Sequence, residues 1–373
     1  MREMLTSAWG HIQGFLFPML RDEVGPLTPC HERLVTVLDV VCVEAFVQTW
    51  RGLPGRPAAD RFALARAFAA KAVLGLPTTL ALLDRLAADN VLRRLCGFES
   101  RSQLPSESTF SRAFAEFAAA SLPERIHQAL IKKTHKNRLA GHISRDSTAI
   151  EARERPVKAP KAPPVPRKRG RPRKDEPPRK KDSRLQRQGA MTLAEMLADL
   201  PKTCGVGAKR NAHGHNVYWT GYKLHIDTAD GDIPISCLLT SASVHDSQAA
   251  IPLASMTAGR VTSLYDVMDS AYDAPEIRTM CRALGHVPII NAKPCRGCKA
   301  TAAAEAKART IAGYELAETI RYRERTASER VNSALKDSYG GRGVRVRGHA
   351  KVFCHLMFGI LALTAERLMQ LVA

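Results

Sequence analysis

The sequence lacks an apolar run long enough to cross a membrane. Spanning the hydrocarbon core takes roughly 18 to 20 consecutive apolar residues, and the longest candidate, 352–364, is interrupted by His355. We therefore expect this segment to form a buried C-terminal helix. Features of a signal peptide are also missing, because charged residues and a proline break up the apolar character of the N-terminus. Both absences predict a cytoplasmic protein with no membrane partner.

Acidic residues are scarce relative to basic ones. The 373 residues include 36 Asp and Glu against 56 Lys and Arg, which gives a formal net charge of +20. An excess of this size predicts a polyanionic partner, and nucleic acid is the usual one for a soluble chain of this length. The chain is long enough for two domains with hydrophobic cores, and its 45% hydrophobic content indicates a globular protein.

Paired cysteine motifs are nearly absent. Most of the nine cysteines are isolated within apolar stretches, which is typical of a reducing compartment. Cys295 and Cys298 form a single CxxC motif, with Cys281 and His286 nearby. A structural zinc site usually has a second, well-spaced pair of ligands. This motif alone therefore does not predict zinc.

The first third of the chain has the apolar periodicity of helices. Four segments show it, separated by breaks that contain glycine and proline: 34–50, 58–74, 78–95 and 108–120. We predict a leader at 1–29 and a helical domain at 30–135. Its helices either pack together only, or place the last segment, with Ser111 and Arg112 on its polar face, in a DNA groove.

The stretch 151–190 breaks this pattern. It holds 15 Lys or Arg against five Asp or Glu, together with eight prolines, and such a composition cannot form a packed core. We predict a basic, proline-rich and disordered insertion within 151–215. Four of its residues resemble the core of an AT-hook, which suits the minor groove of A·T-rich DNA: Arg169, Gly170, Arg171 and Pro172. Non-specific attraction to phosphates is the alternative.

Strand signals dominate the rest of the chain. The candidates are 142–146, 221–227, 233–240, 263–268 and 287–291. The second and third flank a turn and predict a hairpin, and a helix is expected over 275–284. Because a hairpin is followed by alternating strand and helix, we predict a mixed α/β sheet. This second domain would comprise 136–150 and 216–373.

The stretch 321–337 places polar side chains on one helical stripe. Steps of three, four and seven residues separate its four members: Tyr322, Arg325, Glu329 and Lys336. The stripe is either a functional surface or a solvated face on which Arg325 and Glu329 form an ordinary i,i+4 pair. Thr326 and Glu329 also fit a capping box, which would start the regular helix at Thr326. Ile320 is expected on the opposite, packed face.

Three carboxylates are placed where they can converge. Asp146 and Asp269 end predicted strands, and Glu329 lies on the polar stripe. Carboxylates that share a site repel one another unless a cation neutralises them, and hard oxygen ligands suit Mg²⁺, with Mn²⁺ as a substitute. Two such ions would activate water or a 3′-hydroxyl and stabilise the leaving oxygen of a phosphodiester. His245 and Asp246 fit either a pair that supports these acids or a surface turn.

These motifs carry a family resemblance. Asp146 in Arg-Asp-Ser-Thr, Asp269 in Met-Asp-Ser-Ala-Tyr-Asp and Glu329 in Y-x2-R-x3-E-x6-K resemble the acid triad and signature of DDE transposases from bacterial insertion sequences, in the branch named for Tyr-Arg-Glu-Lys. The resemblance implies an RNase H-like catalytic domain, three acidic metal ligands and a divalent-metal cofactor. It also implies synapsis of two element ends by an oligomer, here a homodimer. The DNA contacts it implies are Tyr322, Arg325 and Lys336.

The sequence therefore predicts a transposase that acts on double-stranded DNA. It would hydrolyse phosphodiester bonds at the terminal inverted repeats of an insertion sequence and transfer the freed strands to target DNA. Two alternatives stay open. One is a metal-dependent nuclease of the same fold that cleaves without strand transfer, and the other is a degenerate or repurposed DNA-binding protein without catalysis.

Overall fold

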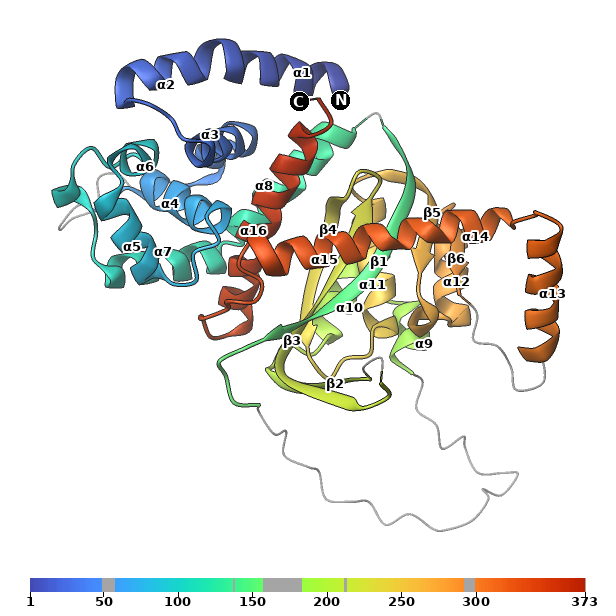
Figure 1. Cartoon of the computed structure of the whole chain (residues 1–373). Coiled ribbons are helices and arrows are strands. Elements are labelled where there is room, and N and C mark those ends of the chain that lie inside the picture. The colour runs from blue at the N-terminus through green and yellow to red at the C-terminus, as the bar shows by residue number, and fades with distance from the viewer. Residues whose placement is uncertain (49–57, 137, 157–182, 211–212, 292–298, 373) are drawn as a thin grey trace, which may run out of the picture.

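A helical N-terminal region is followed by a domain built on a mixed, six-stranded sheet (Figure 1). The computed structural model describes residues 1–48, 58–136, 138–156, 183–210, 213–291 and 299–372. Between the two parts lies the C-terminal helix α16 (His349–Met369), which packs against both. The fold is RNase H-like.

Three of the four predicted helical segments are confirmed, one of them with a break, and the first, 34–50, is confirmed only as far as Val41, where its helix ends. They correspond to α3 (Pro29–Val41), α4 (Arg61–Val73), α5 (Thr79–Ala88) with α6 (Asn90–Leu95), and α7 (Glu107–Ala119). The break between α5 and α6 arises at Asp89, whose side chain accepts a hydrogen bond from the Leu92 N–H at 2.9 Å and so caps a new helix. In the N-terminal region three helices were not predicted: α1 (Arg2–His11), α2 (Phe17–Val24) and α8 (Leu122–His135).

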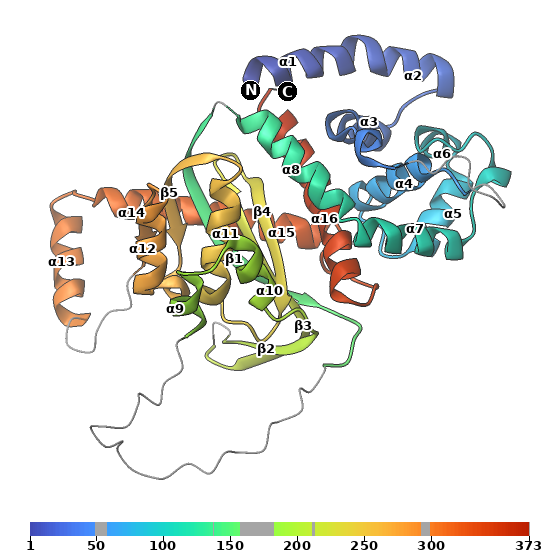
Figure 2. The same ribbon diagram turned by 180° about the vertical axis from the view of Figure 1, so that it is seen from behind.

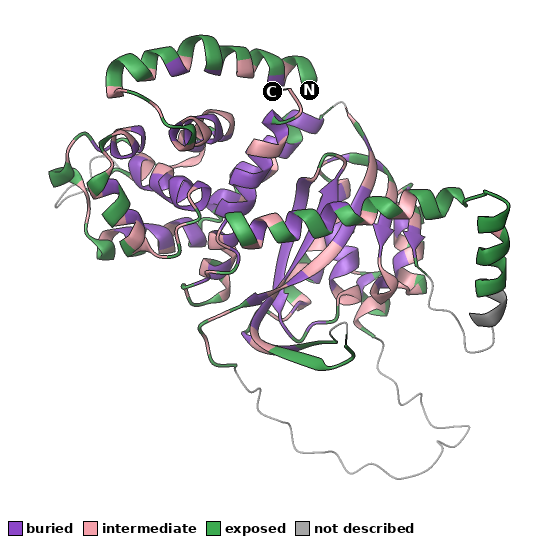
Figure 3. Cartoon of the chain, in the orientation of Figure 1, coloured by how far each residue is buried: buried purple, intermediate pink, exposed green. Residues whose placement is uncertain are grey.

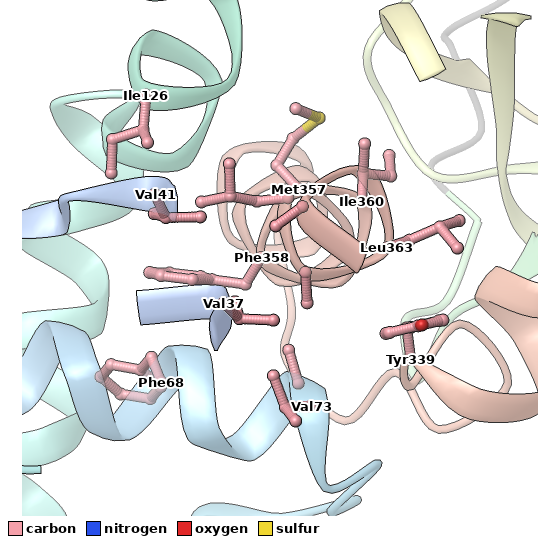
Figure 4. Close-up of a cluster of buried hydrophobic side chains, with 14 of the residues drawn as sticks. Val37, Val41, Phe68, Val73, Ile126, Tyr339, Met357, Phe358, Ile360 and Leu363 are labelled. Carbon is pink, nitrogen blue, oxygen red and sulfur yellow. The ribbon is translucent and has the colours of Figure 1, made fainter. Parts of the chain in front are cut away.

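Helix α16 forms the centre of the main hydrophobic core. Figure 4 shows Met357, Phe358, Ile360 and Leu363 of this helix among side chains from α3, α4 and α8. Within the described part of the chain it is the one helix long and apolar enough to cross a membrane, but 83% of its apolar window is buried in the protein. The prediction of a buried C-terminal helix is therefore confirmed. Each fully buried large apolar side chain contributes about 1.5–3 kcal/mol to the stability of the fold. Because α16 packs on helices of the N-terminal region and on β4, the two parts share one core.

The sheet has the strand order of an RNase H-like fold. The strands are β1 (Leu139–Glu151), β2 (Gly205–Arg210), β3 (Asn216–Ala229), β4 (Ile233–Ser241), β5 (Thr262–Met268) and β6 (Val287–Ile290). Spatially they run β4-β3-β1-β5-β6, antiparallel from β4 to β1 and parallel from β1 to β6. The additional strand β2 pairs with the first half of β3 and was not predicted. It lies, with two short helices, inside 151–215, so the prediction of a disordered insertion is wrong for residues 183–210. All five predicted strands are confirmed.

Helices cover both faces of this sheet. On one face α15 (Thr326–Ser338) crosses β1 and β3, and α16 packs on β4 (Figure 1). The other face is covered by α11 (Ser247–Ala258) and α12 (Pro275–Ala283), with the short helices α9 (Arg184–Gln188) and α10 (Leu193–Asp199) beside them (Figure 2). Helices α13 (Lys299–Ile311) and α14 (Ala317–Tyr322) extend from the edge formed by β6, and both are largely exposed (Figure 3).

A buried ion pair lies beneath the centre of the sheet. Arg145 of β1 donates two hydrogen bonds to Asp227 of β3, each 2.8 Å long, and both side chains are at most 1% exposed. Thr257 of α11 donates a further bond of 2.6 Å to Asp227. On the far side of Arg145, Asp266 lies 4.0 Å away and is itself 3.0 Å from His286. The network joins β1, β3, β5 and α11. It lies on the face of the sheet opposite to the side chain of Asp146, the residue that follows Arg145.

We expect removal of either partner of this pair to destabilise the fold. Arg145→Met leaves the Asp227 carboxylate buried without its cation, which should cost about 3–5 kcal/mol of unfolding free energy. Urea titration of the wild type and the variant measures the loss. The double variant R145M/D227L should recover a large part of it, because no uncompensated Asp227 charge remains. A single variant within 1 kcal/mol of the wild type would contradict this role.

A second prediction concerns the buried histidine of α8. His127 is fully buried, its Nε2 lies 3.0 Å from the Pro234 carbonyl oxygen, and its Nδ1 has no hydrogen-bond partner. Burial, followed by the nearby Arg260, lowers the pKa of His127 from 6.5 to about 3. Between these values the unfolded chain binds a proton that the folded chain does not, so stability falls as the pH drops below 6.5.

The contribution of His127 corresponds to one proton, or about 1.4 kcal/mol per pH unit. Urea unfolding from pH 7.5 to pH 4.5 should therefore show a slope for His127→Gln that is smaller by one proton than the slope of the wild type. The comparison separates this group from other buried titratable residues, including Glu124, whose raised pKa acts in the opposite direction. Parallel curves for the two proteins would show that His127 is charged in the folded state.

Candidate active site

The pairing of β1 with β5 brings two of the predicted acids together. The strands are parallel and in register, with Ser144 opposite Val267 and Arg145 opposite Met268. Asp146 and Asp269 are the next residues along the two strands, so they lie side by side. Asp269 follows the end of β5, but Asp146 lies within β1, which continues to Glu151, and this corrects the prediction that Asp146 ends a strand. Asp269 follows the last residue of β5, and its side chain accepts a hydrogen bond of 2.8 Å from the Ala271 N–H, which begins a short turn.

Helix α15 is fixed over the same part of β1. The Ser144 hydroxyl lies 2.9 Å from the Arg325 carbonyl oxygen and 2.8 Å from the Ser328 hydroxyl. Asn332, one turn after Glu329 on the helix, donates a hydrogen bond of 3.1 Å from its amide nitrogen to Asp146. These contacts place the face that carries Glu329 and Asn332 beside the two aspartates.

The predicted polar stripe is divided between two elements. Tyr322 is the last residue of α14, a short 3-10 turn follows, and the regular helix α15 starts at Thr326. The capping box predicted for Thr326 does not form, since the Thr326 hydroxyl donates to the Arg323 carbonyl oxygen at 2.9 Å. The stripe is preserved through this break, because the Arg325 guanidinium lies 5.7 Å from the centre of the Tyr322 ring. Ile320 is 48% exposed rather than packed, which corrects that expectation.

The charges at the site depend on one another. Burial, and then the adjacent Asp269, raises the pKa of Asp146 to about 6, whereas a backbone hydrogen bond from Ser147 and the nearby Arg325 act against this rise. The same Arg325 forms an ion pair of 2.7 Å with Glu329, whose side chain is 49% exposed. Arg325 therefore interacts with both the half-buried Asp146 and the exposed Glu329.

Lys336 lies two turns beyond Glu329, in a basic cluster. Burial, followed by repulsion from Arg342 and Lys209 of β2, lowers the pKa of its ammonium group. Glu151, at the end of β1, is also close enough to influence it. The stripe therefore runs from the acids toward the far end of β1 and β2, where positive charge accumulates.

Several residues near the acids were not predicted. Asp246, left open between a supporting residue and a surface turn, accepts hydrogen bonds from Ser147 at 2.8 Å and from Lys223 at 2.9 Å. Tyr272 is 1% exposed, and its hydroxyl has no hydrogen-bond partner. Burial, and then the carboxylates of Asp246 and Asp146, raises its pKa well above the ordinary value.

The sequence signals for these residues were weak but present. Asn332 lies one helical turn after Glu329, so it shares the stripe, and Tyr272 follows Asp269 within the same short motif. An asparagine or a tyrosine at such positions is as common on an ordinary packed surface. Only the tertiary contacts show that both face the aspartates.

No three His, Cys, Asp or Glu side chains among the described residues lie close enough together to hold one metal ion. The third acid, Glu329, accepts a hydrogen bond from Arg325 and does not join the two aspartates. Of the residues considered for zinc, His286 pairs with Asp266 at 3.0 Å and Cys281 is a buried free thiol. Cys295 and Cys298 lie outside the described residues, as does the AT-hook-like stretch 169–172.

An RNase H-like sheet with two adjacent aspartates, crossed by a helix that carries a glutamate, is the arrangement expected of the DDE class. Residues 146–365, more than half of the chain, match the family model described as Transposase DDE domain. Residues 27–116 match a second model, described as Transposase domain. The chain therefore belongs to the DDE transposase family. No curated protein and no solved structure matches it.

The adjacency of the aspartates can be tested without measuring activity. Asp269→Asn removes the neighbouring negative charge, so the pKa of Asp146 should fall toward its ordinary value of 3.8. NMR titration of protein labelled with ¹³C at aspartate carboxyl groups follows this change. Asp337→Asn, at the exposed end of α15, is the matched control and should leave the Asp146 titration unchanged. An Asp146 pKa that does not respond to Asp269→Asn would show that the two carboxylates are not neighbours.

Proposed function

We propose that this protein is a transposase of the Tyr-Arg-Glu-Lys branch that cuts DNA at the ends of an insertion sequence and joins the freed ends to target DNA, with Asp146, Asp269 and Glu329 as catalytic residues. The observation that carries the proposal is the adjacency of Asp146 and Asp269 beneath α15. Hydrolysis at the terminal inverted repeats frees a 3′-hydroxyl, and strand transfer joins that hydroxyl to a phosphodiester of the target. Membership of the DDE transposase family supports this chemistry.

The residues at the site fit a divalent cation. Two carboxylates lie side by side, and the pKa of Asp146 is raised because burial and Asp269 disfavour its charged form. A cation between them would remove this penalty, and an all-oxygen set of ligands suits Mg²⁺, with Mn²⁺ as a substitute. Such an ion would supply activation of the attacking oxygen and stabilisation of the leaving oxygen. The three acids would hold it.

Glu329 can join this site at small energetic cost. Its contact with Arg325 is a half-exposed i,i+4 pair, and exposed pairs of this kind contribute about 0.3–0.5 kcal/mol. Side-chain rotation of Glu329 is not opposed by packing, because the residue is exposed. Asn332 holds the Asp146 carboxylate by a hydrogen bond from the same helix face, so α15 fixes one acid while presenting the other.

The remaining stripe residues suit DNA phosphates. Release of Glu329 would leave the Arg325 guanidinium free for a bidentate contact with a phosphate beside the cleaved bond. The hydroxyl of Tyr322 and the ammonium of Lys336 would extend this contact in both directions along α15. The insertion stretch 169–172 would add minor-groove contacts. Two element ends require two active sites, so we propose a homodimer that acts in the bacterial cytoplasm.

One observation favours a second candidate function, a DNA-binding protein without catalysis. Glu329 is paired with Arg325, and the described acids do not form a ready metal site. A chain in which this pair never opens would bind DNA through its basic surfaces and cleave nothing. The same experiment separates the two functions.

We expect Glu329→Gln to abolish cleavage while preserving DNA binding. Purified protein is incubated with Mg²⁺ or Mn²⁺ and a plasmid that carries the gene with its flanking DNA, and strand breaks are mapped. Wild-type protein should cut at the boundaries of the flanking repeats, and loss of a metal-ligating carboxylate should reduce the rate by at least about 100-fold. Glu324→Gln is the matched control, because Glu324 is exposed and lies outside the stripe.

The outcomes are distinct. Metal-dependent breaks followed by joined products support the transposase, whereas breaks without joining indicate a nuclease. Binding by both proteins without any cleavage would favour the non-catalytic function. Cleavage by Glu329→Gln at the wild-type rate would contradict the assignment of the third acid.

A further inference from the structure

A cavity of about 500 Å³ lies between the helical region and the segment that follows α15. Its walls come from α4, from the starts of α5 and α7, and from α16. One side is formed by Arg345, Val346 and Arg347, and another by Arg153, which follows β1. The cavity is therefore built where the helical region, the catalytic sheet and the C-terminal helix meet.

The lining of this cavity is strongly basic. Five of its residues are cationic: Lys71, Arg153, Arg345, Arg347 and Lys351. The acidic lining residue is Glu107 alone. None of the five cations forms an ion pair with a described residue. Their charges are therefore not neutralised within the part of the chain that the structure describes, and an anion from outside would complete them.

Lys71 is the most informative of these residues. It lies within α4 and is only 8% exposed, and its ammonium group has no hydrogen-bond or ion-pair partner among the described residues. Burial lowers the pKa of its ammonium group to about 8. A buried charge without a partner is costly, so its presence at the wall of a cavity indicates a ligand with negative charge.

Backbone groups add to the positive potential. Helix α5 begins at the cavity, where Thr78 caps it and Thr79 is its first residue. The N-terminus of a helix carries unpaired N–H groups and a partial positive charge, which favour an anion. The helix N-terminus and the buried Lys71 together give the cavity the features of a preorganised anion-binding site, which scattered surface charges would not have.

The cavity is continuous with the active site along the chain. Arg153 lies seven residues beyond Asp146, and Arg345 follows the end of α15. Between the two sites lies Lys336 with its neighbours Arg342 and Lys209. A DNA backbone that passes from the acids to the cavity could contact these cations, which have Glu151 and Asp337 as acidic neighbours.

We propose that this cavity holds a stretch of DNA backbone flanking the cleavage site, and that Lys71 is its buried phosphate-binding residue. The proposal rests on the transposase function but concerns binding and not catalysis. A cavity of this volume exceeds what a single inorganic phosphate needs, which favours a segment of sugar and phosphate over a free ion. The site would hold the element end against the helical region while the acids act on the adjacent bond.

The test compares the wild type with three variants for DNA affinity and stability. Wild type, Lys71→Met and Lys133→Met are titrated with a duplex taken from the DNA that flanks the gene, in EDTA and at several salt concentrations. Lys133 is exposed on α8 and does not line the cavity, so it controls for the change in net charge. Arg347→Gln, at the exposed rim, repeats the test without altering the core.

For Lys71→Met we expect binding that is about tenfold weaker and a logarithmic salt slope that is smaller by about 0.9, the value for one phosphate. Its melting temperature should be unchanged or higher, since a buried ammonium without a partner is removed. Arg347→Gln should weaken binding in the same direction. Lys133→Met should bind within about twofold of the wild type, because it loses only a solvated charge.

Wild-type affinity and salt slope in Lys71→Met would overturn the proposal. So would a loss of melting temperature that parallels the loss of affinity, because it would show a structural role. If inorganic phosphate stabilises the wild type but not Lys71→Met while duplex binding is equal, the cavity holds a small anion and the proposal is wrong. Cleavage that is absent while Lys71-dependent binding persists would count against catalysis and leave this inference standing.

Discussion

The central strand β1 is the element on which the site depends. Its side chains alternate between the two faces of the sheet, so Arg145 points into the buried layer while Asp146 faces α15. On the buried side, the pair between Arg145 and Asp227 joins β1 to β3, and Asp266 extends the network to β5. On the other side, the same strand holds Asp146 beside Asp269. A shift of one residue would exchange the two faces, so the buried pair also fixes the acids.

The second constraint is the position of α15 and α16. Helix α15 is held on β1 through Ser144 and Asn332, and α16, which follows it, is buried among helices of both regions (Figure 4). Helix α15, which carries Glu329, is thereby coupled to the helical region. DNA bound by the helical region and cleaved at the sheet would contact two parts that share one hydrophobic core. The cavity at their junction, which both parts line, is consistent with this arrangement.

Much of the fold follows from local sequence patterns, whereas the contacts at the site do not. Alternation and turn residues predicted five of the six strands in the sheet, β1 included, and helical spacing predicted four N-terminal segments that contain five helices. Helix α11 was missed because its sequence is apolar nearly all round and contains Pro252, which obscures both period and propensity. The three acids were found because Asp146 and Asp269 lie at predicted strands and Glu329 lies on a stripe, although β1 continues past Asp146 to Glu151. Their mutual position depends on strand register, which is a tertiary property.

The residues that support the acids show the same limit. Asn332 and Tyr272 are unremarkable in sequence, and only packing shows that they face Asp146 and its neighbours. Lys71 stands within an apolar helix, where a long cationic side chain commonly extends to solvent, and only the structure shows that it is buried at a cavity. For the stripe from Tyr322 to Lys336 the sequence left open whether one helix carries it or the regular helix begins at Thr326, and the structure shows the second, with a 3-10 turn before Thr326.

The most direct test of the central claim is a crystal structure of the protein with Mn²⁺ and a duplex that carries one element end, using anomalous scattering to locate the metal. The account predicts Mn²⁺ bound by Asp146, Asp269 and Glu329 together, with Arg325 turned from Glu329 to a DNA phosphate. Mn²⁺ bound elsewhere, or bound by the aspartates while Glu329 remains paired with Arg325, would contradict it.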